Sequence, residues 1–271
     1  MCRLLGVVAD SPAPLPELLG GDLDPFVELA REHADGWGIS FLDSGGQVVT
    51  AKEPTSALRS WVFRPLAERV VTSAAIVHLR MSSPGSLRIL ENTHPFGGPE
   101  LAFVHNGQFD PAGVLDAGPD ANTADAKGDT DSERYYLAVR DLTLLGSAPP
   151  DAITGAAGLV RSRAASWEST NCLLLTPAGL CAYADHSANS AVIRRRGPDF
   201  FDLRYRTEPG RAVVASTGWT RPGVSWARLP DRRVLEIGRD LMLTVHDEGA
   251  SSSAEAPMAA RRTRSHSNEH R

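Results

Sequence analysis

Short apolar runs separated by turn residues extend along most of the chain. Alternating or continuous apolar positions predict strands in the first half at residues 2–8, 38–42, 47–52, 74–80 and 101–105. The same patterns predict strands in the second half at residues 171–176, 180–184, 191–195, 203–206, 212–216, 225–228, 234–237 and 241–245. Asn106-Gly107 is a dipeptide typical of tight turns, so we expect it to end the strand that begins at residue 101.

Helical patterns are fewer. Residues 24–33 form one candidate helix, with Asp24 as its N-cap. Residues 132–145 form another, because their apolar and aromatic positions fall near one helical face, and a further helical region begins near Pro150. Many strands with few helices, grouped rather than strictly alternating, predict an α+β fold. Two packed sheets with helices outside them fit this set of elements.

The composition narrows the class of protein. The 271 residues suffice for one large domain, and 42% hydrophobic residues supply a core. A net charge of −5 argues against a nucleic-acid partner, and no apolar stretch approaches the length of a membrane span. Three cysteines are too few, and odd in number, for a disulfide framework, which favours the reducing cytoplasm as the location.

Both ends of the chain carry their own predictions. Residues 249–271 are polar and charged with almost nothing to bury, so we expect a disordered tail after a domain at 2–248. At the other end, Cys2 follows Met1. Because a small side chain after Met1 usually permits its removal, we expect Cys2 to become the mature N-terminal residue. Its α-amine, with a pKa of about 7.7–8.0 in ordinary peptides, could then deprotonate its own thiol.

Four further clusters combine with Cys2. They are Asp35-Gly36-Trp37-Gly38, Arg80, His105-Asn106-Gly107-Gln108 and the run at 128–133 that includes Asp131. Each has an ordinary structural explanation, such as a core Trp, a surface ion pair, a turn or a helix cap. Together they suit thiolate attack on an amide. An Asn amide and a Gly N–H can bind the oxyanion, an Arg fork can bind a carboxylate, and an Asp can accept a substrate ammonium. Glutamine or a γ-glutamyl amide carries those groups.

These segments resemble those of a known family, the class II glutamine amidotransferases, which are N-terminal-nucleophile hydrolases. The resemblance rests on Met-Cys-Arg-Leu-Leu-Gly at 1–6, Asp-Gly-Trp-Gly at 35–38, His-Leu-Arg at 78–80, Glu-Asn-Thr-His-Pro-Phe at 91–96, His-Asn-Gly-Gln at 105–108 and Gly-Asp-Thr-Asp-Ser-Glu at 128–133. It extends over roughly residues 2–247 and is strongest for the stand-alone YafJ-like branch, with the ergothioneine-pathway γ-glutamyl hydrolases as neighbours.

The resemblance implies a fold and a catalytic apparatus. The fold would be a four-layer αββα sandwich. Cys2 would be the nucleophile and its own α-amine the general base, while Asn106 and Gly107 would form the oxyanion hole. The resemblance implies neither a metal nor an organic cofactor.

The resemblance also implies how a small-molecule substrate is held. Arg80 would bind the α-carboxylate, and Asp131, together with the Gly107 carbonyl, would bind the α-ammonium. Trp37 and His94 match family motifs and would support the site from behind.

Alternative functions remain open at this point. The leading hypothesis is a stand-alone amidohydrolase that releases glutamate through a γ-glutamyl thioester, because no second domain follows in this sequence. A glutaminase subunit that supplies ammonia to a separate synthase would use the same site. A non-catalytic binding protein would require Met1 to stay in place. Scattered histidines and missing glycine-rich fingerprints argue against a metalloenzyme, a Rossmann enzyme or a P-loop enzyme.

Overall fold

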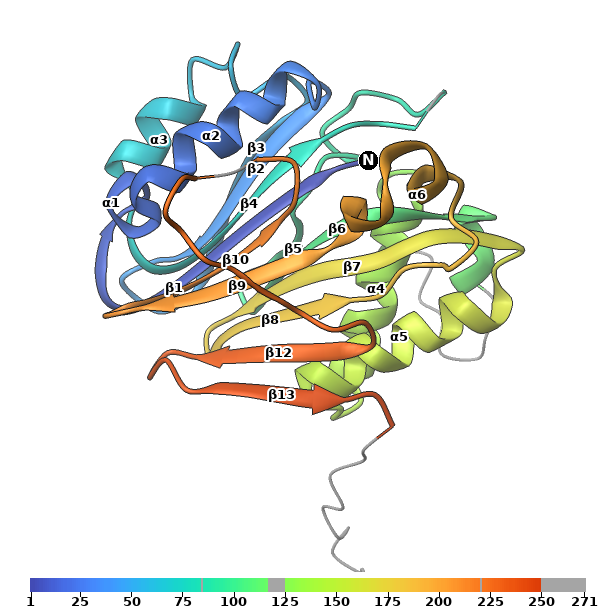
Figure 1. Cartoon of the computed structure of the whole chain (residues 1–271). Helices are drawn as coiled ribbons and strands as arrows, with labels where there is room; N and C mark the ends of the chain where they lie inside the picture. The colour runs from blue at the N-terminus through green and yellow to red at the C-terminus, as the bar shows by residue number, and fades with distance from the viewer. Residues whose placement is uncertain (84, 117–124, 220, 250–271) are drawn as a thin grey trace, which may run out of the picture.

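Two antiparallel sheets lie at the centre of the molecule (Figure 1). The structure, a computed structural model, describes residues 1–83, 85–116, 125–219 and 221–249. One sheet has seven strands in the order β11-β9-β10-β1-β4-β2-β3, and the other has six in the order β13-β12-β8-β7-β6-β5. Apart from Gly249, the predicted disordered tail lies outside the described residues.

Along the chain, blocks of consecutive strands rather than single strands alternate between the two sheets. The seven-stranded sheet comprises β1 (Arg3–Pro14), β2 (Gly36–Leu42), β3 (Val48–Glu53), β4 (Val71–Arg80), β9 (Leu203–Glu208), β10 (Arg211–Ser216) and β11 (Ala227–Arg228). The six-stranded sheet comprises β5 (Phe96–Gly98), β6 (Leu101–Asp110), β7 (Ser166–Thr176), β8 (Gly179–Ala184), β12 (Arg233–Gly238) and β13 (Leu243–Asp247). The α-helices are α1 (Leu15–Leu19), α2 (Leu23–Glu28), α3 (Phe63–Arg69), α4 (Asp131–Leu144), α5 (Pro149–Arg163) and α6 (Ala191–Arg196).

Three apolar layers hold four layers of structure together. Helices α1 to α3 pack on the outer face of the seven-stranded sheet, and α4 and α5 pack on the outer face of the six-stranded sheet (Figure 1). A third apolar cluster fills the space between the sheets. This αββα sandwich confirms the predicted fold.

Strand β1 illustrates how a continuous apolar run in the sequence corresponds to a strand that is buried on both faces. All residues from Arg3 to Ala9 are buried, since the strand lies inside the sheet and both faces are covered. Because side chains alternate along a strand, Leu5 and Val7 join the cluster under the helices, and Leu4 and Val8 join the cluster between the sheets. A continuous apolar run is what a strand buried on both faces needs.

Some local predictions are wrong. The strand predicted at 191–195 is the helix α6, because the Ser190 hydroxyl caps it by accepting from Ile193 N at 3.0 Å. The predicted cap at Asp24 is also wrong, since α2 begins at Leu23. The short helices α1 and α3 and the strand β5 were not predicted.

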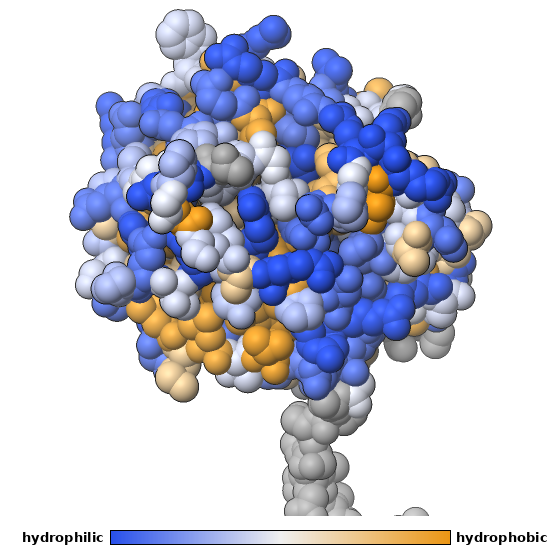
Figure 2. All heavy atoms as spheres, in the orientation of Figure 1, coloured by the Kyte–Doolittle hydropathy of each residue, from blue (hydrophilic) through white to orange (hydrophobic). Residues whose placement is uncertain are grey.

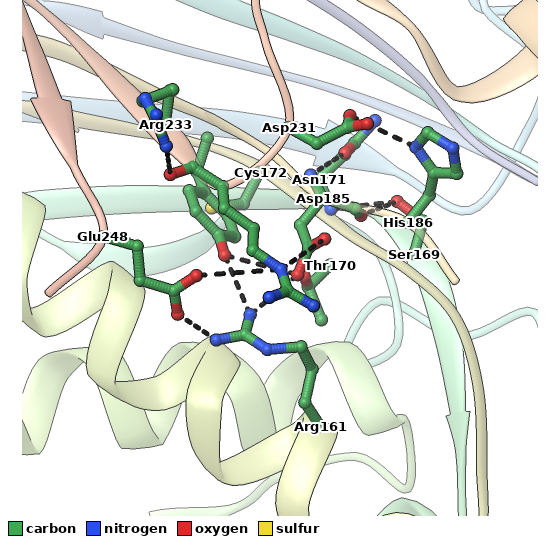
Figure 3. A network of polar contacts seen from close by, with 12 residues as sticks. Arg161, Ser169, Thr170, Asn171, Cys172, Asp185, His186, Asp231, Arg233 and Glu248 are labelled. Carbon is green, nitrogen blue, oxygen red and sulfur yellow. Dashed lines mark hydrogen bonds and ion pairs between the residues drawn. The ribbon is translucent and has the colours of Figure 1, made fainter. Parts of the chain in front are cut away.

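A polar cluster ties the C-terminal strands to α5 (Figure 3). We call Arg161, Tyr183, Asp185 and Glu248 the Arg161 cluster. Arg161 Nη1 donates to Tyr183 OH at 2.9 Å and to Asp185 Oδ2 at 2.7 Å, and Nη2 donates to Glu248. These bonds join α5 to the ends of β8 and β13, so they fasten one edge of the six-stranded sheet.

The surface is largely polar on the face seen in Figure 2, with scattered apolar patches. Within the described residues, none of the helices has the length and apolar character needed to cross a membrane.

Candidate active site

The predicted site residues meet at one end of the sandwich. Cys2 precedes β1, and Arg80 ends β4, its antiparallel neighbour. Strand β6 of the opposite sheet carries Asn106 and Gly107, and α4 begins at Asp131. A cavity of about 210 Å³ lies among these elements, and its lining includes Cys2, Arg80, His94, Gly107 and Asp131. The structure therefore brings together residues that lie far apart in the sequence.

The Cys2 side chain is buried at the edge of this cavity. Its Sγ lies 3.8 Å from the carbonyl oxygen of Met81, the residue after Arg80. Burial raises the pKa of the thiol, while the positive N-terminus lowers it. With Met1 in place, the α-amine belongs to Met1 and lies 2.9 Å from Met81 Sδ. The reactive pair of thiol and α-amine on one residue therefore requires Cys2 to be the N-terminal residue.

Asn106 and Gly107 lie within a strand, so the turn predicted there is wrong. Strand β6 continues to Asp110 and pairs with β7, with Asn106 opposite Asn171. A Cβ on Gly107 would lie 1.7 Å from the carbonyl oxygen of Ser169. Glycine is therefore required for close backbone approach between strands rather than for a turn.

The Asn106 side chain has an unusual environment. It is fully buried, and within the described part of the chain neither its Oδ1 nor its Nδ2 has a hydrogen-bond partner. Buried amides are almost always hydrogen-bonded. Asn106 is not among the residues that line the cavity, but it directly precedes Gly107, which lines it. An unpaired amide at this position is the arrangement that an oxyanion-binding donor would have before its ligand arrives.

Arg80 is held on one side and unpaired on the other. Its Nη2 donates to Ser86 Oγ at 2.9 Å and to the carbonyl oxygen of Leu87 at 3.2 Å. Its Nη1 is buried and has no partner among the described residues. The guanidinium is thus fixed in direction by the segment that follows β4, and an unpaired donor remains for an anion.

The segment after Arg80 is anchored by the first predicted cluster. Asp35 accepts from Ser82 N at 2.9 Å and from Ser82 Oγ at 2.7 Å, and it pairs with Arg88 Nε at 2.8 Å. Burial raises the pKa of Asp35, but these hydrogen bonds and Arg88 outweigh burial and lower it. An ionised Asp35 therefore fastens the segment that positions Arg80.

Asp131 occupies the first turn of α4 but is not its cap. Thr130 is the N-cap, and its hydroxyl accepts from Glu133 N at 3.2 Å. Asp131 instead accepts from Phe109 N at 2.9 Å and from Ser132 N at 2.8 Å. Burial raises the pKa of this carboxyl. A cationic ligand in the cavity would favour its ionised form.

His94 and Trp37 differ in their distance from the cavity. His94 lines it, and its ring stacks on His78 with centroids 4.1 Å apart. Trp37 is fully buried in the apolar layer under α1 to α3, and its Nε1 donates to Glu53 at 2.9 Å. His94 is therefore at the site, whereas Trp37 belongs to the core that supports β2.

Sequence reasoning missed the residues that hold the site residues in place. Met81, Ser82 and Ser86 follow Arg80, and the length of the loop there was the available signal. His105 and Ser132 lie within two of the motifs named from the sequence, but no role was predicted for either, and His105 Nδ1 lies 2.9 Å from Ser132 Oγ.

Comparison with known proteins identifies the family of this chain. Residues 1–200 match the family model of the class II glutamine amidotransferases, and the chain belongs to that family. Family membership supports an amidohydrolase that acts on the glutamine amide in general. The sequence is also 31% identical over 147 residues to YafJ of Escherichia coli (strain K12), which is named as a glutamine amidotransferase. That match covers 50% of this chain and 52% of YafJ, so the chain spans about half the length of this relative.

Solved structures show the same fold. A glutamine aminotransferase class-II domain protein from Silicibacter pomeroyi superposes with a TM-score of 0.61 at 20% identity, covering 91% of this chain and 99% of that one. The glutamine phosphoribosylpyrophosphate amidotransferase of B. subtilis superposes with a TM-score of 0.61 at 16% identity, covering 92% of this chain and 50% of that one. The fold is that of an N-terminal-nucleophile hydrolase.

Proposed function

We propose that this protein is a cysteine-dependent amidohydrolase that releases glutamate from glutamine or a γ-glutamyl amide. The observation that carries the proposal is the cavity in which Cys2, Arg80, Gly107 and Asp131 meet. Each of these residues offers a group that could bind or react with a part of such a substrate.

The proposed reaction begins at Cys2. After Met1 is removed, the α-amine of Cys2 takes the thiol proton, and the thiolate attacks the substrate amide carbon. The oxyanion that forms accepts hydrogen bonds from Asn106 Nδ2 and Gly107 N. The ammonium returns the proton to the departing amine, which leaves a γ-glutamyl thioester on Cys2. Water then hydrolyses the thioester, and the amine again acts as base.

The amino-acid end of the substrate binds between two charges. Arg80 receives the α-carboxylate through the Nη1 that has no partner in the described structure. Asp131, with the Gly107 carbonyl, receives the α-ammonium. Its Oδ1 accepts from both Ser132 N and Ser132 Oγ, whereas its Oδ2 accepts only from Phe109 N among the described residues and keeps a lone pair for the ligand. His94 shapes the wall of the cavity beside them.

The test compares glutamate release by the purified protein from glutamine and from a panel of γ-glutamyl amides. Cys2→Ala should abolish turnover without loss of folding. Cys181→Ala is the matched control, because Cys181 is also a buried thiol but lies outside the cavity, and it should keep the activity. Mass spectrometry of the N-terminal peptide must find Cys2 first. Full activity in Cys2→Ala would disprove the mechanism.

A second candidate is an ammonia-supplying subunit of a separate synthase. The comparison with the B. subtilis amidotransferase favours this candidate, because this chain covers only 50% of the length of that chain. This candidate uses the same residues but predicts slow turnover alone and faster turnover with the partner. Rapid Cys2-dependent turnover of one γ-glutamyl amide by the isolated chain would favour the hydrolase instead.

A further inference from the structure

Arg3 is a buried arginine that forms no ion pair with an acidic residue in the described part of the chain. It follows Cys2 directly, and only 4% of its surface is exposed. Among the described residues, none accepts a hydrogen bond from its Nε or Nη1. Glu32 is the carboxylate whose charge acts on Arg3, but Glu32 is bonded to Arg196 Nη2. Burying an unpaired cation opposes folding, so its presence next to the nucleophile calls for a functional reason.

The surroundings hold this cation in a defined place. The Arg3 guanidinium lies 4.4 Å from the centre of the Phe200 ring, in the short 3-10 helix Pro198–Phe201. Arg196 of α6 lies 5.8 Å from the same ring. Gly218 has a φ of 107°, and a Cβ there would lie 3.1 Å from Arg3 Nε. An aromatic platform and a glycine together make room for the guanidinium.

Positive charge is in excess at this end of β1. The α6 helix lies beside the N-terminus (Figure 1). The groups whose charges act on the N-terminal amine or on the Cys2 thiol are Cys2, Arg3, Glu32, His33, Arg80, Asp131 and Arg196. Burial lowers the pKa of His33 to about 3, so His33 is neutral. The two cations Arg3 and Arg196 therefore face one carboxylate, Glu32, on the helix-covered side of β1.

We propose that Arg3 is a positioning residue for the nucleophile, whose buried cation keeps the Cys2 α-amine unprotonated and favours the thiolate. The inference rests on the proposed function, in which that amine is the base. The physical reason is that a nearby positive charge disfavours an ammonium and favours a thiolate. Both effects prepare the same proton transfer, from Sγ to the amine nitrogen.

Charges already acting at the N-terminus agree with this role. For the α-amine of Met1, which precedes Cys2 in this structure, burial lowers the pKa most, and Arg3 and Arg196 lower it further, while Cys2 and Glu32 raise it. Burial lowers the pKa of Arg3 itself to about 10, which leaves it charged at physiological pH. A cation that stays charged in the interior can act on the amine through the whole working pH range.

The test is the pH dependence of kcat/KM for the full-length protein with its best amide substrate. In a plot of kcat/KM against pH, the acid limb is the part where activity falls as the amine becomes protonated. Arg3→Gln should shift this acid limb to higher pH by about 0.5–1 unit. Turnover at pH 6 then falls about 3- to 10-fold, because the fraction of unprotonated amine changes tenfold per pH unit, while the plateau near pH 9 is retained. Arg3→Lys keeps the charge and should keep the limb. Arg31→Gln removes an exposed cation paired with Glu28 and should change nothing.

A purely structural role for Arg3 would look different. Arg3→Gln would then lower kcat/KM equally at all pH values, with no movement of the limb, and the inference would be overturned. If Arg3→Gln fails to fold, Arg196→Gln removes the second cation and should shift the limb in the same direction by less. The inference would also be overturned if Arg196→Gln left the acid limb unshifted and Arg3→Lys shifted it.

A second readout separates this inference from the proposed function. Alkylation of Cys2 by iodoacetamide, followed by mass spectrometry of the N-terminal peptide, needs no substrate. If no amide is turned over but Arg3→Gln shifts the pH profile of Cys2 alkylation to higher pH, the inference would be supported although the proposed function had failed. Cys2-dependent turnover with both profiles unshifted would overturn the inference alone.

Discussion

Arg80 and Arg161 are both arginines held in polar surroundings, but their hydrogen bonds are completed in different ways. Arg161 donates to Tyr183, Asp185 and Glu248, so protein groups complete its bonding (Figure 3). Arg80 donates through Nη2 only, and its buried Nη1 has no partner in the described structure. The amide of Asn106 beside the cavity is likewise unpaired.

The difference separates stability from binding. A completed network lowers the free energy of the folded state, and loss of one partner is costly. A buried donor without a partner opposes folding, because it has given up its hydrogen bonds to water, so we infer that it is kept for a ligand. We therefore expect substitutions at the Arg161 cluster to change unfolding and substitutions at the cavity to change turnover.

The largest effect is expected for Arg161→Met. The substitution leaves Asp185, whose side chain is 3% exposed, without its close ion pair, and we expect the free energy of unfolding to fall by about 3–5 kcal/mol. Denaturant unfolding measures this loss, and KM should be unchanged. Arg31→Met, which breaks an exposed pair with Glu28, is the control and should cost less than about 1 kcal/mol. Equal stability of the two variants would contradict the comparison.

Asn106→Ala should have nearly as large an effect, but on catalysis. Loss of one oxyanion donor lowers kcat by about 10²–10³-fold. Stability should hardly change, because the amide has no protein partner among the described residues. Steady-state kinetics and unfolding of the same samples give both quantities.

The residue opposite Asn106 in the sheet supplies a matched control. Asn171 accepts from Asp185 N at 2.8 Å and donates to the carbonyl oxygen of Phe201. Asn171→Ala should therefore lose stability and keep kcat. The reverse outcome in the two variants would mean that the unpaired amide does not mark the reacting centre.

Arg80→Lys should mainly raise KM. A lysine keeps the charge, but it reproduces neither the guanidinium that Ser86 and Leu87 fix in direction nor the Nη1 donor that remains for the ligand. We expect about a tenfold or larger rise in KM for glutamine. Arg64→Lys changes an exposed arginine that pairs with Asp24 and does not line the cavity, and it serves as control. An unchanged KM in Arg80→Lys would argue that the α-carboxylate binds elsewhere.

The smallest effect concerns His186, which pairs with Asp231 at 3.3 Å beside the Arg161 cluster (Figure 3). The hydrogen bond with Asp231 raises the pKa of His186. A raised pKa in the folded state stabilises the protein fully below about pH 6.5, and this contribution is lost as pH rises through the folded-state pKa. Because Asp231 is 41% exposed, the contribution is only about 0.3–0.5 kcal/mol. The stability difference between the native protein and His186→Gln should therefore shrink from pH 6 to pH 8.5; a constant difference would contradict the assignment.

Local pattern predicted most of the strands correctly and also predicted residues that the fold brings together at the cavity. Cys2, Arg80 and Asp131 stand at the ends of apolar runs or at a loop–helix junction, where polar residues are noticed easily. Asn106-Gly107 was found as a motif but wrongly interpreted as a turn, since the pairing that extends β6 depends on β7, more than 60 residues later. The Ser190 hydroxyl caps the helix α6. This cap was overlooked in the sequence because the β-branched pair Val192-Ile193 favours a strand.

The sequence alone determined the class of fold and pointed to a candidate nucleophile and candidate binding residues, because side-chain alternation and residue type are properties of short segments. Only the tertiary structure decided which donors are satisfied. Within the described part of the chain, Arg80 Nη1 and the Asn106 amide remain unpaired, both terminal nitrogens of Arg161 have partners, and Arg3 is buried without an acid. Hydrogen-bond and charge satisfaction depend on groups that meet only after folding, so no local pattern contains that information.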